Sequence, residues 1–335
     1  MKENSMTKTI LAILKVLEKH NQEVIGSREI SRQLTSYGIE LTERTIRYHL
    51  KIMDERGLTE VHGKEGRTIT EKGMEELKNA HVSERVGFII SKIESLSYQS
   101  DFDMEKKTGN VVLNISSFPA SRLKEARKLA GKVFDSPYVM SDRVRVAREG
   151  ESIADYVVPE GMVGIGTVCS VTINSVFLKH GIPVASKYGG LMEVNRSGPT
   201  RFTSLISYEG SSLDPLVVFI RSRMTSVSEA MKGGTGLVLA SFREIPIVTI
   251  REAMDLQKRM KELGIGGLLK IGAPNQALYE IPVGMDKAGM VVVGGLNPVA
   301  ALEEAGIETI NKAMSVMYRY EELVPFGEAM KELGT

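Results

Sequence analysis

Cysteine is almost absent from this sequence, because Cys169 is the single example among 335 residues. One thiol cannot form a disulfide within the chain, which fits a reducing compartment. The first ten residues lack the basic-then-apolar pattern of a signal peptide, and no apolar run approaches the roughly 18 residues needed to cross a bilayer. These absences predict a soluble, cytoplasmic protein with no membrane partner.

A surplus of charge is also missing. The formal net charge is +1, and the first 80 residues carry 14 Lys or Arg against 13 Asp or Glu. Composition therefore gives no indication of nucleic-acid binding, and such a function must depend on where the charges lie. With 42% hydrophobic and 25% charged residues, the chain is an ordinary globular protein, long enough for two or three folding units.

Three helices are predicted in the N-terminal segment. Apolar residues recur at three- and four-residue spacing from Ile10 to Leu17, as one buried stripe of a helix requires. Ser27 can cap a second helix, which ends near Gly38. Thr42 can cap a third helix, TERTIRYHLKIMDERG, that stops at Gly57.

The third helix has two different faces. Its inward stripe is aliphatic, and its other face presents cationic and aromatic side chains at helical spacing. Guanidinium groups can contact guanine edges and cations can contact phosphates, so this face suits the major groove. The inward residues are Ile46, Leu50 and Met53, and the outward residues are Arg44, Arg47, Tyr48 and Lys51.

A hairpin is predicted after the third helix. Two β-prone runs, Leu58–His62 and Arg67–Thr70, flank a four-residue turn with glycine at both ends. Lys64 at the tip and Arg67 on the return strand are placed to touch phosphates or a minor groove. A short helix from Glu71 to about Asn79 closes the unit. Three helices followed by a hairpin form a winged helix-turn-helix, and the segment resembles bacterial and archaeal winged-helix repressors.

This winged helix predicts binding to double-stranded DNA, with recruitment of another protein as the alternative. The near-neutral charge of the segment supports the alternative. The residues expected to contact DNA are Ser27, Arg28, Thr42, Arg44, Thr45, Arg47, Tyr48, Lys51, Lys64 and Arg67.

A connecting helix is predicted from Ser83 to Gln99, followed by a polar boundary from Ser100 to Gly109. The helix is either an arm for dimerisation or a helix packed on its own chain. The expected domains are therefore a winged helix at 1–80, a connector at 81–109 and a third segment, the body, at 110–335.

The body alternates β-rich runs with helical runs. This alternation, with two similar pairs of runs, predicts a duplicated α/β (α+β) domain with at least one parallel strand pair. A ligand often binds where the halves of such a domain meet. The β-rich runs are Val111–Ile115, Gly161–Gly166, Leu216–Ile220 and Gly289–Gly294, and the helices that follow them include Ala120–Gly131 and Ser226–Lys232.

Several motifs resemble those of a known family. The recognition segment TERTIRYHL precedes a body that carries GMVGIGTVCSVTINSVFLKHGIPV, YGGLMEV and GMVVVGGLNPVAALEEAGIET. Together they resemble the archaeal nitrogen-regulatory repressor family, NrpR, over nearly the whole chain. The resemblance implies a repressor that binds inverted-repeat operators as a homodimer and is released by 2-oxoglutarate. Some members carry two body domains, whereas this chain is similar to the shorter type, which can act with a second NrpR-type protein that lacks the winged helix.

An effector with two carboxylates needs several donors and a cation. The runs ending at Gly166 and Gly294 each open a helix, whose N-terminus can bind a carboxylate, and two arginines that flank Ser197-Gly198-Pro199 could clamp it. The residues expected to bind the effector are Gly166, Thr167, Cys169, Ser170, Arg196, Arg201, Gly294, Gly295 and Asn297.

An enzyme fused to a winged helix is the other alternative, with Cys169 as nucleophile. Such a thiol needs a base, and His180 is the one histidine of the body. If one helix joins them, their separation is roughly 16 Å along its axis, too far for direct proton transfer. No HExxH, CxxC or GxxxxGK[ST] motif occurs. We therefore predict no catalytic residue, no metal ion and no cofactor.

Overall fold

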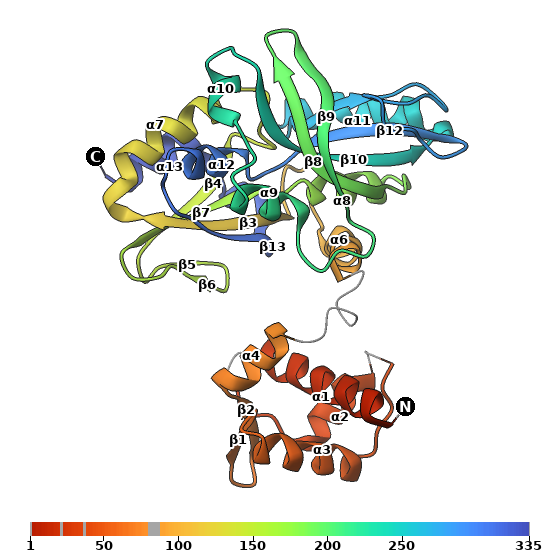
Figure 1. Ribbon diagram of the computed structural model, residues 1–335, viewed down its shortest axis with the longest axis vertical. Coiled ribbons are helices and arrows are strands. Elements are labelled where there is room, and N and C mark those ends of the chain that lie inside the picture. Colours follow the sequence, from red (N-terminus) through yellow and green to blue (C-terminus); the bar gives the residue numbers. More distant parts are fainter. Residues whose placement is uncertain (1, 21–22, 36–37, 80–87, 335) are drawn as a thin grey trace. The chain divides into compact units, whose positions relative to one another are not determined.

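The computed structural model describes residues 2–20, 23–35, 38–79 and 88–334. The chain divides into two compact units, Met1–Val86 and Gly87–Thr335, and each unit has a hydrophobic core of its own. Figure 1 labels the elements of both units.

The first unit is a winged helix. Its elements are α1 (Lys2–Lys19), α2 (Ser27–Thr35), α3 (Glu43–Glu55), β1 (Thr59–His62), β2 (Gly66–Ile69) and α4 (Glu71–Asn79). β1 and β2 pair antiparallel as a hairpin. The sequence predicted each of these elements, with the strand ends displaced by one residue. It did not predict the additional backbone bridge between Ile25 and Arg67.

The core of the first unit is the aliphatic stripe of each helix. Thr42 caps α3, because its side chain accepts a hydrogen bond from the Thr45 backbone N–H at 3.3 Å. Gly57, just after α3, has a φ of 70°, which glycine adopts without strain. The fully buried side chains include Ile13, Leu14, Ile30, Leu34, Ile46, Leu50 and Met53.

Two five-stranded sheets form the framework of the second unit. The first sheet has the order β13-β3-β7-β4-β14, and the second has the order β11-β12-β10-β8-β9. The strands of the first sheet are β3 (Asn110–Pro119), β4 (Arg143–Arg148), β7 (Met162–Val168), β13 (Ile310–Arg319) and β14 (Val324–Pro325). Those of the second are β8 (Ala185–Asn195), β9 (Gly198–Ser207), β10 (Gly236–Pro246), β11 (Leu268–Ile271) and β12 (Lys287–Val293).

The expected parallel strand pair is wrong. Every pairing between strands of the described chain is antiparallel. β3 and β4 are joined through a helix and run in the same direction, but β7 lies between them and pairs with both. β12 separates β10 from β11 in the same way. A helix therefore joins two strands of the same direction, as expected, but these two strands are not hydrogen-bonded to each other.

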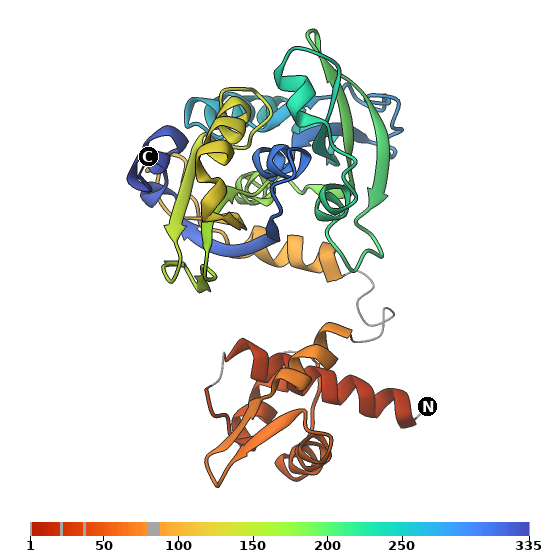
Figure 2. The same ribbon diagram turned by 60° about the vertical axis from the view of Figure 1, so that its left-hand side comes forward.

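The helices pack on and between the two sheets. α12 packs against α7 and α10, and α13 packs against α7. Figure 2 shows α12, in blue, in the interior of the unit, with α7 in yellow beside it. The helices are α6 (Phe88–Gln99), α7 (Leu123–Phe134), α8 (Val171–Lys179), α9 (Pro215–Arg221), α10 (Val227–Met231), α11 (Ile250–Glu262), α12 (Asn297–Glu304) and α13 (Phe326–Glu332).

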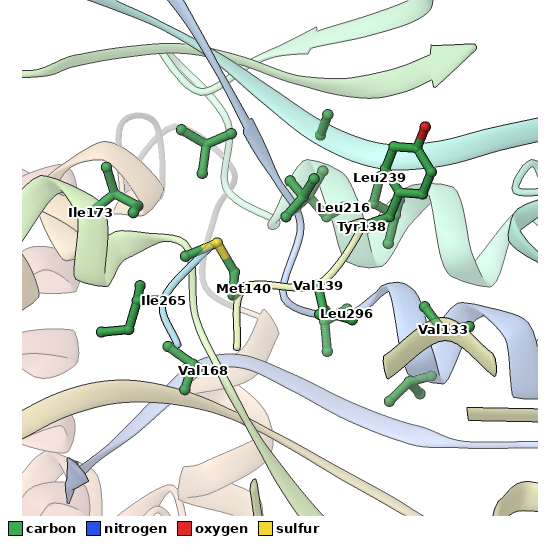
Figure 3. Packing of buried hydrophobic residues seen from close by; sticks show 14 of the residues in the cluster. Val133, Tyr138, Val139, Met140, Val168, Ile173, Leu216, Leu239, Ile265 and Leu296 are labelled. Atoms are coloured by element: carbon green, nitrogen blue, oxygen red, sulfur yellow. The ribbon is translucent and has the colours of Figure 1, made fainter. Parts of the chain in front are cut away.

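The body contains two series of elements with the same order. The first series runs from β3 through α7, β7 and α8 to β8, and the second runs from β10 through α11, β12 and α12 to β13. Each series gives its last strand to the sheet of the other, because β8 pairs with β10 and β13 pairs with β3. Both series share one core, which includes Val168 and Ile173 of the first series and Leu239 and Leu296 of the second (Figure 3).

The strand expected at Leu216–Ile220 is wrong, because these residues form the helix α9. The Asp214 side chain accepts hydrogen bonds from the backbone N–H groups of Leu216 and Val217 at 2.8 and 3.3 Å. Pro215 occupies the first turn, where its missing N–H is tolerated. This N-terminal cap overrides the β-branched run that suggested a strand.

The described part of the expected connector at 81–109 belongs to the second unit. Residues 81–87, including Val86, lie outside the described residues. α6 packs along α8, with Ile89 and Ile93 buried. Phe102 and Met104 are buried in the core of the body. The helix is therefore packed on its own chain, and the polar segment after it is no domain boundary.

Candidate nucleic-acid interface and ligand cavity

The outward face of α3 is exposed along its length. Tyr48 is 61% exposed, and Arg44, Arg47 and Lys51 are exposed beside it. The aliphatic stripe on the opposite side is fully buried, together with His49, whose pKa burial lowers. A helix that is anchored on one side and carries guanidinium, ammonium and phenol groups on the other can donate to base edges and phosphates.

Glu43 organises the cations at the start of this face. Its carboxylate lies 2.6 Å from Nη2 of Arg47 and 3.9 Å from Nε of Arg28, and it accepts a hydrogen bond from Ser27 Oγ at 3.0 Å. Hydrogen bonding to Arg47 lowers the pKa of Glu43 below its usual value. The structure therefore brings together three predicted DNA contacts from α2 and α3. Glu43 was not among the residues predicted from the sequence, although its position four residues before Arg47 was a signal.

Thr42 and Thr45, also predicted DNA contacts, bond to each other through their hydroxyls at 2.9 Å. Both lie at the N-terminus of α3, where their hydroxyls stabilise the first turn. This end of α3 is thus held in place beside the Glu43 cluster.

The two predicted contacts of the hairpin have different surroundings. Lys64 is exposed in the turn. Arg67 instead forms a two-pronged ion pair with Asp54 of α3, in which the two side chains are 21% and 20% exposed. Arg67 therefore ties the wing to α3, a role that the sequence spacing alone did not indicate.

The second unit contains a small cavity, lined by both polar and apolar residues, between its two series of elements. Its volume is only about 20 Å³, room for about one water molecule. It is lined by Cys169 and Ser170 at the start of α8, by Gly295 before α12, and by Arg243 of β10. Ile93 of α6 also lines it. Three predicted effector residues therefore meet at one place.

Arg243 is the buried cation of this cavity, with 2% of the residue exposed. Its Nε donates to Ser241 Oγ at 3.2 Å, and its Nη1 donates to the Ser170 carbonyl at 2.9 Å and to the Asn174 side chain. No described Asp or Glu forms an ion pair with it. Burial lowers the pKa of Arg243 to about 10, so the guanidinium is still charged at neutral pH. A buried guanidinium without a carboxylate partner favours an anionic ligand.

Further ionisable groups surround Arg243. Lys92 of α6 lies near Cys169 and Asp214, and burial lowers its pKa. Burial raises the pKa of Asp214 and of Tyr208, and raises that of Cys169 to about 11. Lys92, Asp214, Tyr208 and Arg243 were not predicted from the sequence, because they come from α6, from the segment between β9 and α9, and from β10, which no local motif connects.

The other predicted effector residues have different positions. Gly166 and Thr167 lie within β7, and Thr167 Oγ1 is buried with no hydrogen-bond partner among the described residues. Asn297 joins the two series, because it bonds to the backbone of Leu239 and donates to the Tyr138 carbonyl at 3.0 Å. Its neighbour Gly294 donates to the Leu239 carbonyl at 2.8 Å.

Arg196 and Arg201 do not line the cavity. Arg196, at the turn between β8 and β9, donates to the Gly233 carbonyl at 3.0 Å. Arg201 lies 3.4 Å from the Glu193 carboxylate and is 58% exposed. Each arginine therefore has a partner on the β8–β9 hairpin or close to it.

The geometry around Cys169 does not favour a nucleophile. Its pKa of about 11 is opposite to the change that activates a thiol. His180 lies at the far end of α8 and bonds to the Val176 carbonyl at 2.8 Å. Within the described residues no group of three or more His, Cys, Asp or Glu could hold a metal ion. No helix in the described part of the chain is long and apolar enough to span a bilayer.

Comparisons with known proteins agree with this division into two units. Residues 86–325 match the family model of the NrpR regulatory domains NRD1 and 2, and residues 11–77 match that of the ribonuclease R winged-helix domain. A solved structure described as a nitrogen repressor-like protein from Methanococcus jannaschii is similar, with a TM-score of 0.60 and 30% identity. That match covers 71% of this chain and 98% of the solved chain.

Two curated relatives align over 96% of this chain. The global nitrogen regulator NrpRI of Methanosarcina mazei is 36% identical, and 99% of its length is covered. The global nitrogen regulator NrpR of Methanococcus maripaludis is 30% identical, and the chain spans 57% of its length.

A winged helix followed by a larger α/β body of this regulatory type defines a two-domain regulator. The chain belongs to the NrpR family.

Proposed function

We propose that this chain is a cytoplasmic transcriptional repressor of nitrogen-assimilation genes and that it binds inverted-repeat operator DNA through α3 and the wing. The proposal rests chiefly on the outward face of α3, where Arg44, Arg47, Tyr48 and Lys51 are exposed over a buried stripe. The names of the relatives, which are global nitrogen regulators, supply the class of target genes.

The second part of the proposal concerns release. 2-Oxoglutarate is the proposed effector, and the cavity between the two series of the body is its proposed site. Arg243 lines this cavity and matches one of its two carboxylates, and Ser170 and Gly295 offer further polar groups. Lys92 lines the neighbouring hollow, close to Cys169 and Asp214, and is the nearby cation proposed for the second carboxylate. Release from DNA requires that the effector bind the two states of the protein with different affinity.

The proposed assembly is a homodimer, because an inverted repeat presents two equal half-sites to a two-fold axis. A second NrpR-type protein that lacks a winged helix is a further proposed partner, as the family resemblance implies. We further propose that the body is a duplication, which the equal order of elements in its two series supports.

The test is a selection of DNA sequences by the purified full-length protein, followed by fluorescence anisotropy on the selected site. We expect an inverted repeat, and we expect added 2-oxoglutarate to weaken the complex. Selection without any enriched sequence would contradict the reader, whereas an operator complex insensitive to 2-oxoglutarate would contradict only the effector.

Recruitment of a protein is the second candidate, because Glu43 already engages Arg28 and Arg47 and the first unit is nearly neutral. Measuring affinity at different salt concentrations distinguishes DNA binding from protein binding. Affinity for DNA falls steeply with ionic strength because phosphate contacts release counterions. Binding that is indifferent to salt would favour a protein partner.

A further inference from the structure

The cavity around Arg243 is too small for the ligand that its charges suit. Its volume of about 20 Å³ holds about one water, whereas a five-carbon dicarboxylate needs many times that space. The side chain of Ile93, from α6, forms part of its wall and is 4% exposed. Occupancy therefore requires that a wall of the cavity move. Two walls lie outside the two series: Ile93 of α6, and the segment that carries Tyr208, Asp214 and Leu216.

α6 lies between two larger hollows. One of about 460 Å³ is lined by Ile90, Ile93 and Glu94 of α6 and by Ser186. The other, of about 240 Å³, is lined by Ile89 and Lys92 of α6 and by Asp214. Ile93 and Ser186 also line the Arg243 cavity, as does Asp214. A displacement of Ile93 therefore joins the closed cavity to space that is already present beside it.

The two ends of α6 are held differently. Beyond its C-terminal end the Ser100 carbonyl accepts from Ser175 Oγ at 3.2 Å, and Ser100 Oγ donates to the Asn110 carbonyl at 2.7 Å. No side chain between Phe88 and Gln99 forms an ion pair or a hydrogen bond to another described element. The one backbone bond near the N-terminal end, from Ile89 N–H to the Ser211 carbonyl, is long at 3.5 Å. Apolar contacts and the proximity of Lys92 to Asp214 hold the N-terminal part of the helix, and hydrogen bonds of Ser100 fix the chain just beyond its C-terminal end.

The loosely held end is also the attachment point of the winged helix. α4 ends at Asn79 and α6 begins at Phe88, so eight residues of chain join the first unit to the N-terminus of α6. Along the chain, α6 is therefore the described element of the second unit that comes first after the winged helix.

We propose that α6 is a movable roof over the Arg243 cavity, that a dicarboxylate enters by displacing Ile93, and that this displacement carries occupancy to the winged helix. The inference deepens the proposed function and depends on it for the identity of the ligand. The movement of α6 does not depend on the proposed function, because it can be measured without any ligand.

Cys169 provides a direct measurement of the roof. It is the single thiol of the chain and it lines the cavity under α6, so alkylation by iodoacetamide reports one site. We expect Ile93→Ala to raise the labelling rate of the full-length protein by about tenfold or more, because truncation removes the main apolar contact of the roof. Ile93→Val should give a smaller increase with less risk to folding. Ile271→Ala on β11, which does not line the cavity, is the matched control for general loosening of the body.

The outcomes separate the two proposals. Equal labelling of the wild type and both Ile93 variants overturns the roof, whether or not an effector binds. In the wild type, 2-oxoglutarate should slow labelling by filling the cavity. If it does not, while the Ile93 effect persists, the roof is supported and the effector is contradicted.

Coupling between α6 and the winged helix is tested by measuring operator affinity. Without effector, Ile93→Ala should weaken operator binding by about tenfold relative to Ile271→Ala, because an open roof mimics the occupied state. Faster labelling with unchanged operator affinity would support the roof but overturn its coupling to the winged helix.

Discussion

Arg67 on the wing strand β2 lies against Asp54 near the end of α3, with Nε 2.9 Å from Oδ1 and Nη2 2.8 Å from Oδ2. Thr59 on β1 donates to the same carboxylate at 2.6 Å. One carboxylate thus joins both strands of the wing to the reading helix. The angle of the wing therefore follows that of α3, which matters for any surface that the two elements contact together.

Removing that carboxylate charge should destabilise the first unit. We expect Asp54→Asn to lower the free energy of unfolding by about 1–3 kcal/mol, because a mostly buried guanidinium loses its partner. Glu55→Gln is the control, since Glu55 is 65% exposed and its pair with Lys51 is 4.0 Å long, and its loss should be below about 1 kcal/mol. Urea unfolding followed by circular dichroism measures both. Equal effects of the two substitutions would mean that the Arg67 pair contributes nothing special.

Arg47 should be needed to read the operator. We expect Arg47→Ala to weaken binding to a selected operator by about 1–3 kcal/mol and to relax the base preference at one position. Lys15→Ala removes one exposed positive charge from α1 and serves as the control. Gel shifts on matched and single-mismatch sites make the comparison. If both variants bind alike, Arg47 is no part of the reader.

Arg243 should determine the response to a dicarboxylate. We expect Arg243→Met to reduce affinity for 2-oxoglutarate by about 1.5–3 kcal/mol, since the hydrogen bonds lost involve a charged group. Arg243→Lys should restore only part of this affinity, because a lysine keeps the charge but lacks the planar fork. Arg251→Met removes an exposed arginine of α11 as the control. Calorimetry gives the affinities, and a wild-type heat for Arg243→Met would place the ligand elsewhere.

Cys169 should make stability depend on alkaline pH. The thiol ionises near 9.0 when exposed and near 11 when buried in the fold, so the unfolded chain loses its proton first. The wild type should therefore lose stability relative to Cys169→Ala as the pH rises from about 9 to about 11, by at most about 1.4 kcal/mol per pH unit. Below pH 9 the difference should be constant. Urea unfolding of both proteins across this range tests the sign, and a parallel pH dependence would show that the thiol is not buried.

Gly295 should tolerate no side chain. A Cβ there would lie 2.2 Å from the Val168 carbonyl oxygen and 2.6 Å from Asn114 Nδ2, so Gly295→Ala forces the two series apart. We expect a loss of about 1–3 kcal/mol, as for overpacked cores. Gly266→Ala meets no atom within 4 Å and is the control. Thermal unfolding compares them, and similar melting temperatures would contradict the close approach.

The sequence predicts local structure best where one signal acts alone. The helix spacing, the Thr42 cap and the glycines of the hairpin each determine a short segment, and all of these segments are present. The segment Leu216–Ile220 failed because its β-branched residues and the Asp214-Pro215 cap give opposite signals, and the cap prevails. The prediction of a parallel strand pair failed for a different reason. Whether two parallel strands are neighbours depends on whether a third strand inserts between them, as β7 does between β3 and β4, and the local sequence does not contain that information.

The cavity was predictable only in part. The glycines expected to precede two helices indicated Ser170 and Gly295, which do meet. The expected helix start at Gly166 is wrong, because β7 continues to Val168 and α8 begins at Val171. Arg243 lies in the interior of a strand and is separated from Ser170 by 73 residues, so no motif connects them. Two ion pairs show the same difference in predictability. The Arg47–Glu43 pair has helical spacing and could be found from the sequence, whereas the Arg67–Asp54 pair spans 13 residues and could not.

The interchange of β8 and β13 makes the body indivisible. Cutting the chain between the two series would leave β3 and β10 each with an open edge, and an open edge invites pairing with another molecule. We therefore expect neither piece to be stable as an autonomous fragment. We expect the body to melt in a single transition, and a nicked body to remain associated until both sheets come apart together.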